Sequence, residues 1–150
     1  DGVEKKALVA RARELSANVH FLAYQPLEYA KQVILLADIG LVSLKPEIYK
    51  YAYPSKTMAY LEQGTPIIAM LEYESELATE VCRLGCGFNV ACGDYQGLAT
   101  LIERLVDDDG WKQPMSAAAQ RLFTQKFSAD VILGRWSNVV LTGVTKRSSD

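Results

Sequence analysis

The sequence predicts an α/β fold, a Rossmann-like doubly wound parallel sheet, and two observations lead to it. Short apolar segments alternate along the chain with segments whose apolar residues recur at helical spacing. The apolar segments are brief and nearly continuous, as expected of strands buried on both faces of a parallel sheet. Strand–helix–strand units of this kind are right-handed and place helices on both sides of the sheet.

The first part of the chain contains two predicted helices and two predicted strands. Residues 3–15 carry apolar side chains at helical spacing, and residues 18–24 alternate apolar and polar side chains as a strand does. A second helix is expected over residues 26–37, since its proline suits the first helical turn. Residues 39–44 form a short apolar run that is typical of a buried strand.

The middle of the chain repeats this order. The predicted helix over residues 55–64 begins at a serine that can cap it and ends at a glycine that can stop it. A strand is expected over residues 66–71, a second serine-to-glycine helix over residues 75–85, and a further strand over residues 87–91. Ligands of such sheets bind beyond the carboxyl ends of the strands, so the loops that follow the strands are the candidates for a site.

The last part of the chain is predicted to be helical. After Asp94 the apolar residues follow an i, i+3, i+4, i+7 pattern, and further helices are expected over residues 111–127 and 128–141. Residues 1–141 are expected to form one domain and residues 142–150 a polar, frayed tail. Because the chain opens directly on a helix, at least one strand is expected to precede it.

Composition excludes several classes of function. A net charge of −2 provides no basic surface for a broad nucleic-acid footprint, so no nucleic-acid partner is expected. No apolar run approaches the ~18 residues that a membrane span requires. The first residues lack the apolar core of a signal peptide, so nothing marks secretion.

The cysteines Cys82, Cys86 and Cys92 are expected to be free structural thiols in a reducing compartment. A zinc site is the alternative, but it would need further ligands, and the single histidine, His20, lies far away in the sequence. No metal site is therefore predicted. His20 is expected at a strand edge or on the surface rather than in catalysis.

The strongest candidate for chemistry is the loop that leads into the predicted helix at Ser55. A helix N-terminus offers unpaired N–H groups and a partial positive charge to a phosphate, and Lys45 and Lys56 add cations. Ser55 is expected to face an open cleft with both lysines near its rim. The alternative is that Ser55 only caps the helix and the lysines are solvated. The chain has no glycine-rich phosphate loop of the G-x-G-x-x-G or Walker type.

Catalytic residues are not assigned by the sequence. Glu72, Glu74 and Glu76 follow a predicted strand, where two carboxylates could do acid–base work. The alternative is that they begin a helix, where negative charge is favourable. The chain has no Ser–His–acid set with clear geometry.

Residues 53–69, with their Pro-Ser-Lys, helix and Gly-Thr-Pro-Ile-Ile-Ala, resemble GT-B glycosyltransferases of the family 4 type. The closest in appearance are bacterial enzymes of the colanic acid and exopolysaccharide type. The resemblance continues in residues 18–26, 37–44 and 85–94, in the same order as in that family. It covers nearly the whole chain.

The resemblance implies that residues 1–141 are the nucleotide-sugar-binding, C-terminal half of such an enzyme. The residues that it assigns to the nucleotide base are Leu22, Ala23 and Tyr24. Those that it assigns to the sugar, diphosphate and ribose are Lys45, Tyr53, Pro54, Ser55 and Lys56. The family's two glutamates, eight positions apart, correspond here to Tyr51 and Ala59, so the chain departs from the pattern at those contacts.

The function implied is transfer of a sugar from a UDP- or GDP-type donor to a lipid-linked or saccharide acceptor in polysaccharide biosynthesis. No metal or other cofactor is implied, and the configuration of the sugar is retained. The partner is the N-terminal acceptor-binding domain of the same parent enzyme, so this chain alone is expected to be inactive. The location implied is cytoplasmic, with peripheral association at the inner membrane face.

The last helix of GT-B enzymes often crosses back to the partner domain. Four apolar side chains of the predicted last helix are therefore expected to be partly exposed, and these are Trp136, Val139, Val140 and Leu141.

Two alternatives remain open. One is a sugar-nucleotide epimerase of the same fold, which would want acids and histidines in its cleft. The other is a non-catalytic α/β nucleotide-binding or signalling module. A signalling module of this fold would need an acidic cluster at a strand end with a threonine and a lysine on later strands, and we do not find that set in the sequence.

Overall fold

The computed structural model describes residues 2–147 of the chain, with side-chain surroundings described as far as residue 141. The chain divides into two compact units, Asp1–Val33 and Ile34–Asp150. Each unit is treated by itself below. The assignment of residues 1–141 to a single nucleotide-sugar-binding domain stays a prediction.

The first unit contains helix α1 (Lys5–Glu14) and most of helix α2 (Leu27–Leu36), joined by an extended segment. Both helices confirm the predicted ones. The strand predicted over residues 18–24 is wrong, because this segment forms no ladder with any strand of the described chain. Alternation favours an extended backbone, but a strand also needs a hydrogen-bonded neighbour. The apolar side chains of the segment are accordingly exposed, among them Val19 and Leu22.

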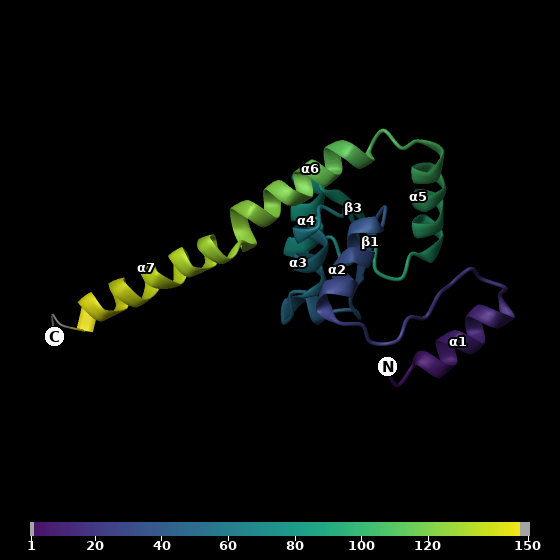
Figure 1. The fold of residues 1–150 in the computed structure, drawn as a ribbon, viewed down its shortest axis with the longest axis horizontal. Coiled ribbons are helices and arrows are strands. Elements are labelled where there is room, and N and C mark those ends of the chain that lie inside the picture. Colours follow the sequence, from purple (N-terminus) through teal and green to yellow (C-terminus); the bar gives the residue numbers. More distant parts are fainter. Residues whose placement is uncertain (1, 148–150) are drawn as a thin grey trace. The chain divides into compact units, whose positions relative to one another are not determined.

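The second unit is built on a three-stranded parallel sheet in the order β1-β2-β3. Figure 1 labels the two outer strands, β1 and β3. The strands are β1 (Gly40–Ser43), β2 (Ile67–Met70) and β3 (Gly87–Val90). Gly40 of β1 pairs with Ile67 of β2, which pairs with Gly87 of β3. Helix α3 (Lys56–Glu62) connects the first two strands and helix α4 (Glu76–Arg83) the second two. These elements confirm the predicted Rossmann-like α/β class.

The central strand shows why the fold is doubly wound. Successive residues of a strand face opposite sides of the sheet. Ile67 and Ala69 lie in one core cluster, while Ile68 and Met70 lie in another. The first cluster includes core residues from α3, α4 and helix α6 (Lys112–Leu122), namely Leu61, Leu77, Val81 and Leu122. Leu98 and Leu101 of helix α5 (Tyr95–Asp107) pack against the second cluster, so each face of β2 has its own helical cover.

The ends of α3 and α4 follow the predicted glycine signals, and the start of α5 has a cap that the sequence analysis did not predict. Gly64 and Gly85 have left-handed φ values of 69° and 66°, a conformation that glycine adopts without steric cost, just after α3 and α4. The Asp94 side chain caps α5 by accepting a hydrogen bond of 2.8 Å from the Gly97 N–H. The α3 start differs, because the Ser55 side chain makes no capping hydrogen bond.

The C-terminal region differs from its prediction in two places. The helix expected over residues 111–127 divides into helix α6 (Lys112–Leu122) and a π-helical turn, η2 (Phe123–Phe127). Helix α7 (Ala129–Arg147) runs six residues beyond its predicted end, so the frayed tail is wrong for residues 142–147. Residues 148–150 of that predicted tail lie outside the described residues.

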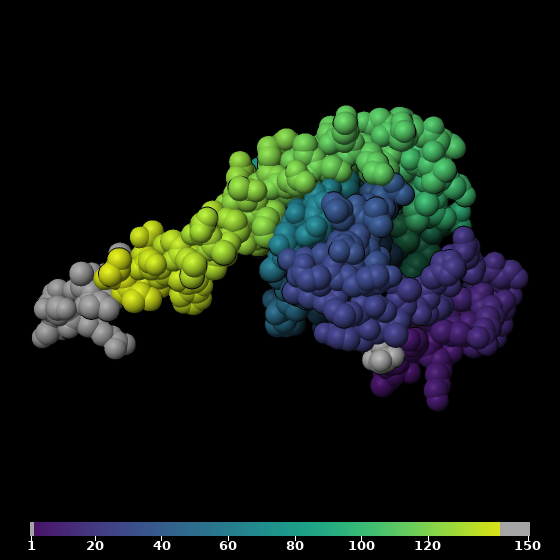
Figure 2. All heavy atoms as spheres, in the orientation of Figure 1, coloured from purple at the N-terminus to yellow at the C-terminus, as the bar shows by residue number. Residues whose placement is uncertain are grey.

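Exposure of α7 is as predicted. Its surface forms the yellow end of the space-filling view, and most of its described side chains are exposed (Figure 2). Trp136, Val139, Val140 and Leu141 are all more than half exposed, at 64%, 61%, 57% and 65%. The partner that would cover them stays a prediction.

Candidate functional site

Three loops meet at the carboxyl ends of the parallel strands. Because β1, β2 and β3 run in one direction, the loops that follow them share one edge of the sheet. Two contacts tie these loops together. The Glu47 N–H donates a hydrogen bond of 2.7 Å to Oε1 of Glu72, and the Cys92 thiol donates to the Leu44 carbonyl at 3.6 Å. The edge is therefore a connected surface, in the place where sheets of this class bind ligands.

Glu72 anchors the longest of these loops. Glu47 stands in a left-handed conformation, with φ at 70°, that residues other than glycine rarely adopt. Its hydrogen bond to the Glu72 carboxylate compensates for part of that strain. The second carboxylate oxygen of Glu72 is buried without a hydrogen-bond partner among the described atoms. Glu72, one of the three acids singled out in the sequence, thus has a structural role in holding the loop.

A small cavity of about 230 Å³ lies at this edge. It is lined by Tyr49, Lys50, Tyr51, Ala52, Tyr53, Pro54, Ser75, Glu76 and Leu77. Its walls come from the loop after β1, including the short 3₁₀ helix η1 (Ile48–Lys50), and from the start of α4. Two of the predicted donor contacts, Tyr53 and Pro54, therefore line a cavity.

The other predicted contacts of this loop lie outside the cavity lining. Ser55 precedes the first residue of α3, as expected, and it follows Pro54 of the lining directly. Lys45, Ser55 and Lys56 are all exposed. The structure confirms that Ser55 stands at a helix start. It does not place Ser55 or the two lysines in the cavity wall.

The predicted base contacts, Leu22, Ala23 and Tyr24, belong to the extended segment of the first unit and are exposed. Their role with the nucleotide base stays a prediction, as does that of the loop residues with the sugar and diphosphate.

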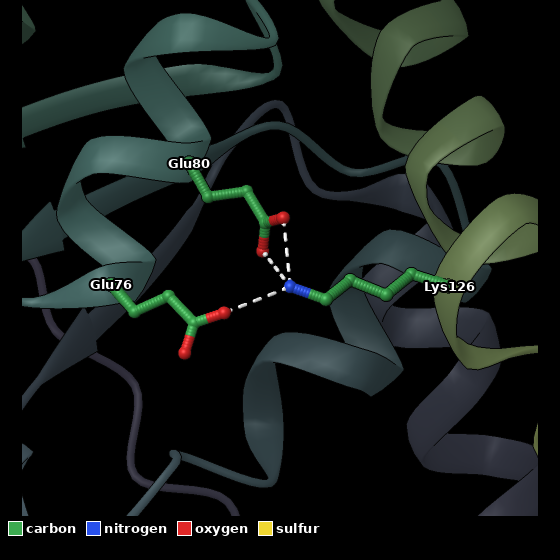
Figure 3. A network of polar contacts seen from close by, with 3 residues as sticks. All are labelled: Glu76, Glu80 and Lys126. Atoms are coloured by element: carbon green, nitrogen blue, oxygen red, sulfur yellow. Dashed lines mark hydrogen bonds and ion pairs between the residues drawn. The ribbon is translucent and has the colours of Figure 1, made fainter.

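An ion cluster stands beside the cavity (Figure 3). The Lys126 ammonium group of η2 donates to both carboxylate oxygens of Glu80, at 2.8 and 3.0 Å, and to Oε1 of Glu76, at 3.0 Å. Burial lowers the pKa of Lys126, but the hydrogen bonds to Glu80 and Glu76 outweigh burial, so its pKa lies above the ordinary value of a lysine. The lysine therefore stays charged at neutral pH.

Sequence reasoning missed this cluster. Glu76 and Glu80 are four residues apart, so they share one helix face. Like charges at this spacing repel each other, so the spacing favours a neighbouring cation. Lys126, however, is 46 residues beyond Glu80, and no local pattern connects them. The pairing arises only because η2 packs near the start of α4.

Tyr53 links the cavity to the same region. Its ring packs against the Phe127 ring, with centroids 5.8 Å apart. Its hydroxyl is buried without a hydrogen-bond partner among the described atoms. Burial, and then the negative charges of Glu80 and Glu76, raise the pKa of Tyr53, so the phenol stays neutral. Thr57, the second residue of α3, also has a buried hydroxyl without a hydrogen-bond partner among the described atoms.

A larger, apolar cavity of about 450 Å³ lies elsewhere in the second unit. It is lined by residues at the amino end of β1, such as Ile39, and by residues of α5 and the start of α6, such as Leu105 and Lys112. Its position, at the edge opposite the strand-end loops, makes it a poorer candidate for the site.

The described residues show neither a metal-binding cluster nor a membrane-spanning helix. They contain no group of three or more His, Cys, Asp and Glu side chains arranged to hold a metal ion. They also contain no helix with the length and apolar character that crossing a membrane requires. Metal independence stays a prediction.

Comparison with known proteins supports a glycosyltransferase relationship. No family model matches the chain. The chain is 24% identical over 140 residues to a probable glycosyltransferase, WbjE, of Pseudomonas aeruginosa. The match covers 93% of this chain and 34% of the relative's length. The chain is thus a distant relative of a probable glycosyltransferase and spans about a third of that protein's length.

Proposed function

We propose that this chain is the nucleotide-sugar-binding part of a glycosyltransferase that uses a UDP- or GDP-type donor. The observation that carries the proposal is the match to a probable glycosyltransferase over 93% of the chain. The fold supports it, because parallel α/β sheets bind nucleotides at the carboxyl ends of their strands.

Each predicted donor contact has a role in this proposal. Leu22, Ala23 and Tyr24 bind the base. Lys45, Ser55 and Lys56 meet the diphosphate, since exposed lysines and a helix start both favour negative charge. Tyr53 and Pro54 lie at the cavity and meet the sugar.

The remaining steps are proposed for the whole protein. The acceptor is lipid-linked or a saccharide, bound by a separate N-terminal domain, and the reaction takes place at the cytoplasmic face of the membrane without a metal. No described residue of this chain is proposed as the catalytic base. Glu72 holds the loop after β1, and Glu80 is paired with Lys126.

A binding screen tests the proposal. The full-length protein is titrated calorimetrically with UDP-, GDP- and dTDP-sugars. We expect one nucleotide class to bind with a dissociation constant in the micromolar range and the others at least about tenfold more weakly, a difference near 1.4 kcal/mol. Binding of none of the three would contradict a nucleotide-sugar site. Interconversion of the sugar without an acceptor would favour the epimerase instead.

A further inference from the structure

One carboxylate of the cavity lining at the strand ends is held by a lysine that lies outside the lining. Glu76 lines the cavity, and Lys126, which does not, donates to its Oε1 at 3.0 Å. Among the described residues, no hydrogen bond to Oε2 of Glu76 is found. The Glu76 side chain is 75% exposed. The lysine thus fixes one oxygen and leaves the other available to a ligand (Figure 3).

The charge of this wall is negative. Lys126 is a single cation shared by two carboxylates, and the nearly buried Glu80 takes two of its hydrogen bonds. Lys50, the cation in the cavity lining, is already paired with Glu47. A ligand that enters the cavity therefore meets a net negative charge at Glu76.

The size and surface of the cavity restrict what fits. At about 230 Å³ it is smaller than the 300–1,000 Å³ typical of pockets for whole drug-sized ligands, so it suits a single ring rather than a complete nucleotide-sugar. Tyr53, Pro54 and Leu77 provide apolar surface for the face of such a ring. A carboxylate can only accept hydrogen bonds, so it selects ligands that carry hydroxyl donors.

We propose that this cavity takes the sugar ring of the donor, and that Glu76 selects a neutral pyranose over a uronate. The proposal rests on the proposed function and adds the class of sugar. Glu76 accepts hydrogen bonds from ring hydroxyls, whereas the carboxylate of a uronate would meet a like charge. Lys126 is the positioning residue, because it holds Glu76 at the cavity through the ion pair.

The test compares matched neutral and acidic donors in the full-length protein. Calorimetry measures the affinities of UDP, UDP-glucose and UDP-glucuronate, and of GDP, GDP-mannose and GDP-mannuronate. We expect the neutral sugar nucleotide to bind at least about fivefold more tightly than its uronate in whichever series binds. Glu76→Gln should reduce that ratio at least about fivefold and leave the affinity for the free nucleoside diphosphate unchanged.

Three further variants distinguish the positioning of Glu76 by Lys126 from a general effect of charge near the cavity. Lys126→Met should reduce the neutral-to-uronate ratio, and Lys126→Arg should preserve it, because arginine keeps the ion pair. Glu74→Gln is the matched control, since Glu74 is an exposed acid in the loop just before Glu76 and does not line the cavity. Thermal melting of each variant checks that the fold is kept, and the ratio is compared among folded variants.

The outcomes distinguish this inference from the function on which it rests. If neither UDP nor GDP binds, both are overturned. If a nucleotide binds but the uronate binds as well as the neutral sugar, or Glu76→Gln leaves their ratio unchanged, only the sugar inference is overturned. An effect of Glu76→Gln without one of Lys126→Met overturns the positioning role of the lysine alone.

Discussion

Lys50, in the loop after β1, and Lys56, at the start of α3, carry the same charge but differ in their hydrogen-bond partners. Lys50 pairs with Glu47, and the hydrogen bond to Glu47 raises its pKa. Lys56 is exposed in the first turn of α3. An anionic ligand must compete with Glu47 for the first lysine but not for the second.

We therefore expect Lys56→Ala to lower transferase activity of the full-length protein more than Lys50→Ala does. Loss of one charge-assisted hydrogen bond to a diphosphate costs about 1.5–3 kcal/mol, or roughly ten- to a hundredfold in kcat/KM. Lys50→Ala should cost several-fold less than Lys56→Ala. Steady-state kinetics with the donor identified by the screen measures both. Equal effects of the two substitutions would count against the diphosphate role of Lys56.

Cys82 and Cys86 differ in burial. The Cys86 side chain is fully buried, and burial raises the pKa of its thiol to about 11. Cys82, one turn earlier, is exposed. The thiolate is the reactive form, and it must also be accessible to the reagent. Cys86 should therefore react slowly, because its thiol is buried and its pKa is raised.

In native protein at pH 8, iodoacetamide should therefore modify Cys82 at least about tenfold faster than Cys86. Peptide mass spectrometry after timed quenching measures the two rates. In denaturant the rates should converge. A fast reaction of Cys86 in the native protein would show that the core around α4 opens readily.

At the scale of elements, the two glycines after α3 and α4 allow a matched test. Both have a positive φ, so alanine at either is strained by about 1–2 kcal/mol. A Cβ at Gly85 would meet nothing within 4 Å, whereas a Cβ at Gly64 would stand 2.8 Å from Nε2 of Gln120. Gly64→Ala should therefore destabilise the fold more than Gly85→Ala does.

Chemical denaturation measures the two free energies of unfolding. The free energy of unfolding is also measured for Gln120→Ala alone and for the double variant Gly64→Ala with Gln120→Ala. Once the loss from Gln120→Ala alone is subtracted, the double variant should lose about as much free energy of unfolding as Gly85→Ala does. If Gly85→Ala is the more damaging of the two single variants, the structure of the α3 and α4 ends is wrong.

Local signals predicted most elements because their causes are local. Apolar periodicity and glycine stops act within one or two turns, and the strands and helices between residues 26 and 107 form where these signals place them. The strand over residues 18–24 failed because pairing depends on a distant neighbour. The π turn at residues 123–127 and the full length of α7 have no comparable signal in the sequence.

The same reasoning applies to the site. The loop after β1 was predictable, because strand ends in a parallel sheet are the expected place for a ligand. Tyr53 and Pro54 of the cavity lining were predicted through the resemblance alone. The Lys126 ion pairs and the Glu72 anchor join residues far apart in the sequence, so they emerge only with the tertiary structure.

At the scale of the whole molecule, the proposed chemistry needs more than this chain. Aligning a donor with an acceptor can be worth ~7–11 kcal/mol of the barrier, and a diphosphate is best held by several preorganised donors. The chain spans 34% of the length of its glycosyltransferase relative. The contacts that we propose for the diphosphate in this chain are a helix start and two exposed lysines.

We expect the 150-residue chain alone to show no transferase activity and to bind UDP or GDP with a dissociation constant at or above roughly 1 mM, near −4 kcal/mol. Ligand-observed NMR detects binding in this range, and the full-length protein is the positive control. Micromolar binding by the chain alone would mean that the described residues form a complete nucleotide site.

One feature of the sheet matters for anyone who prepares this chain in isolation. Strand β1 pairs with β2 along one side, and the described residues provide no strand for its other side. Its outward-facing Leu41 is about half exposed, at 47%. Natural proteins blunt such an edge with charge, since an open row of backbone donors and acceptors recruits other chains. A lysine in place of Leu41 is accordingly the first change for an engineer who wants a preparation that resists aggregation at high concentration.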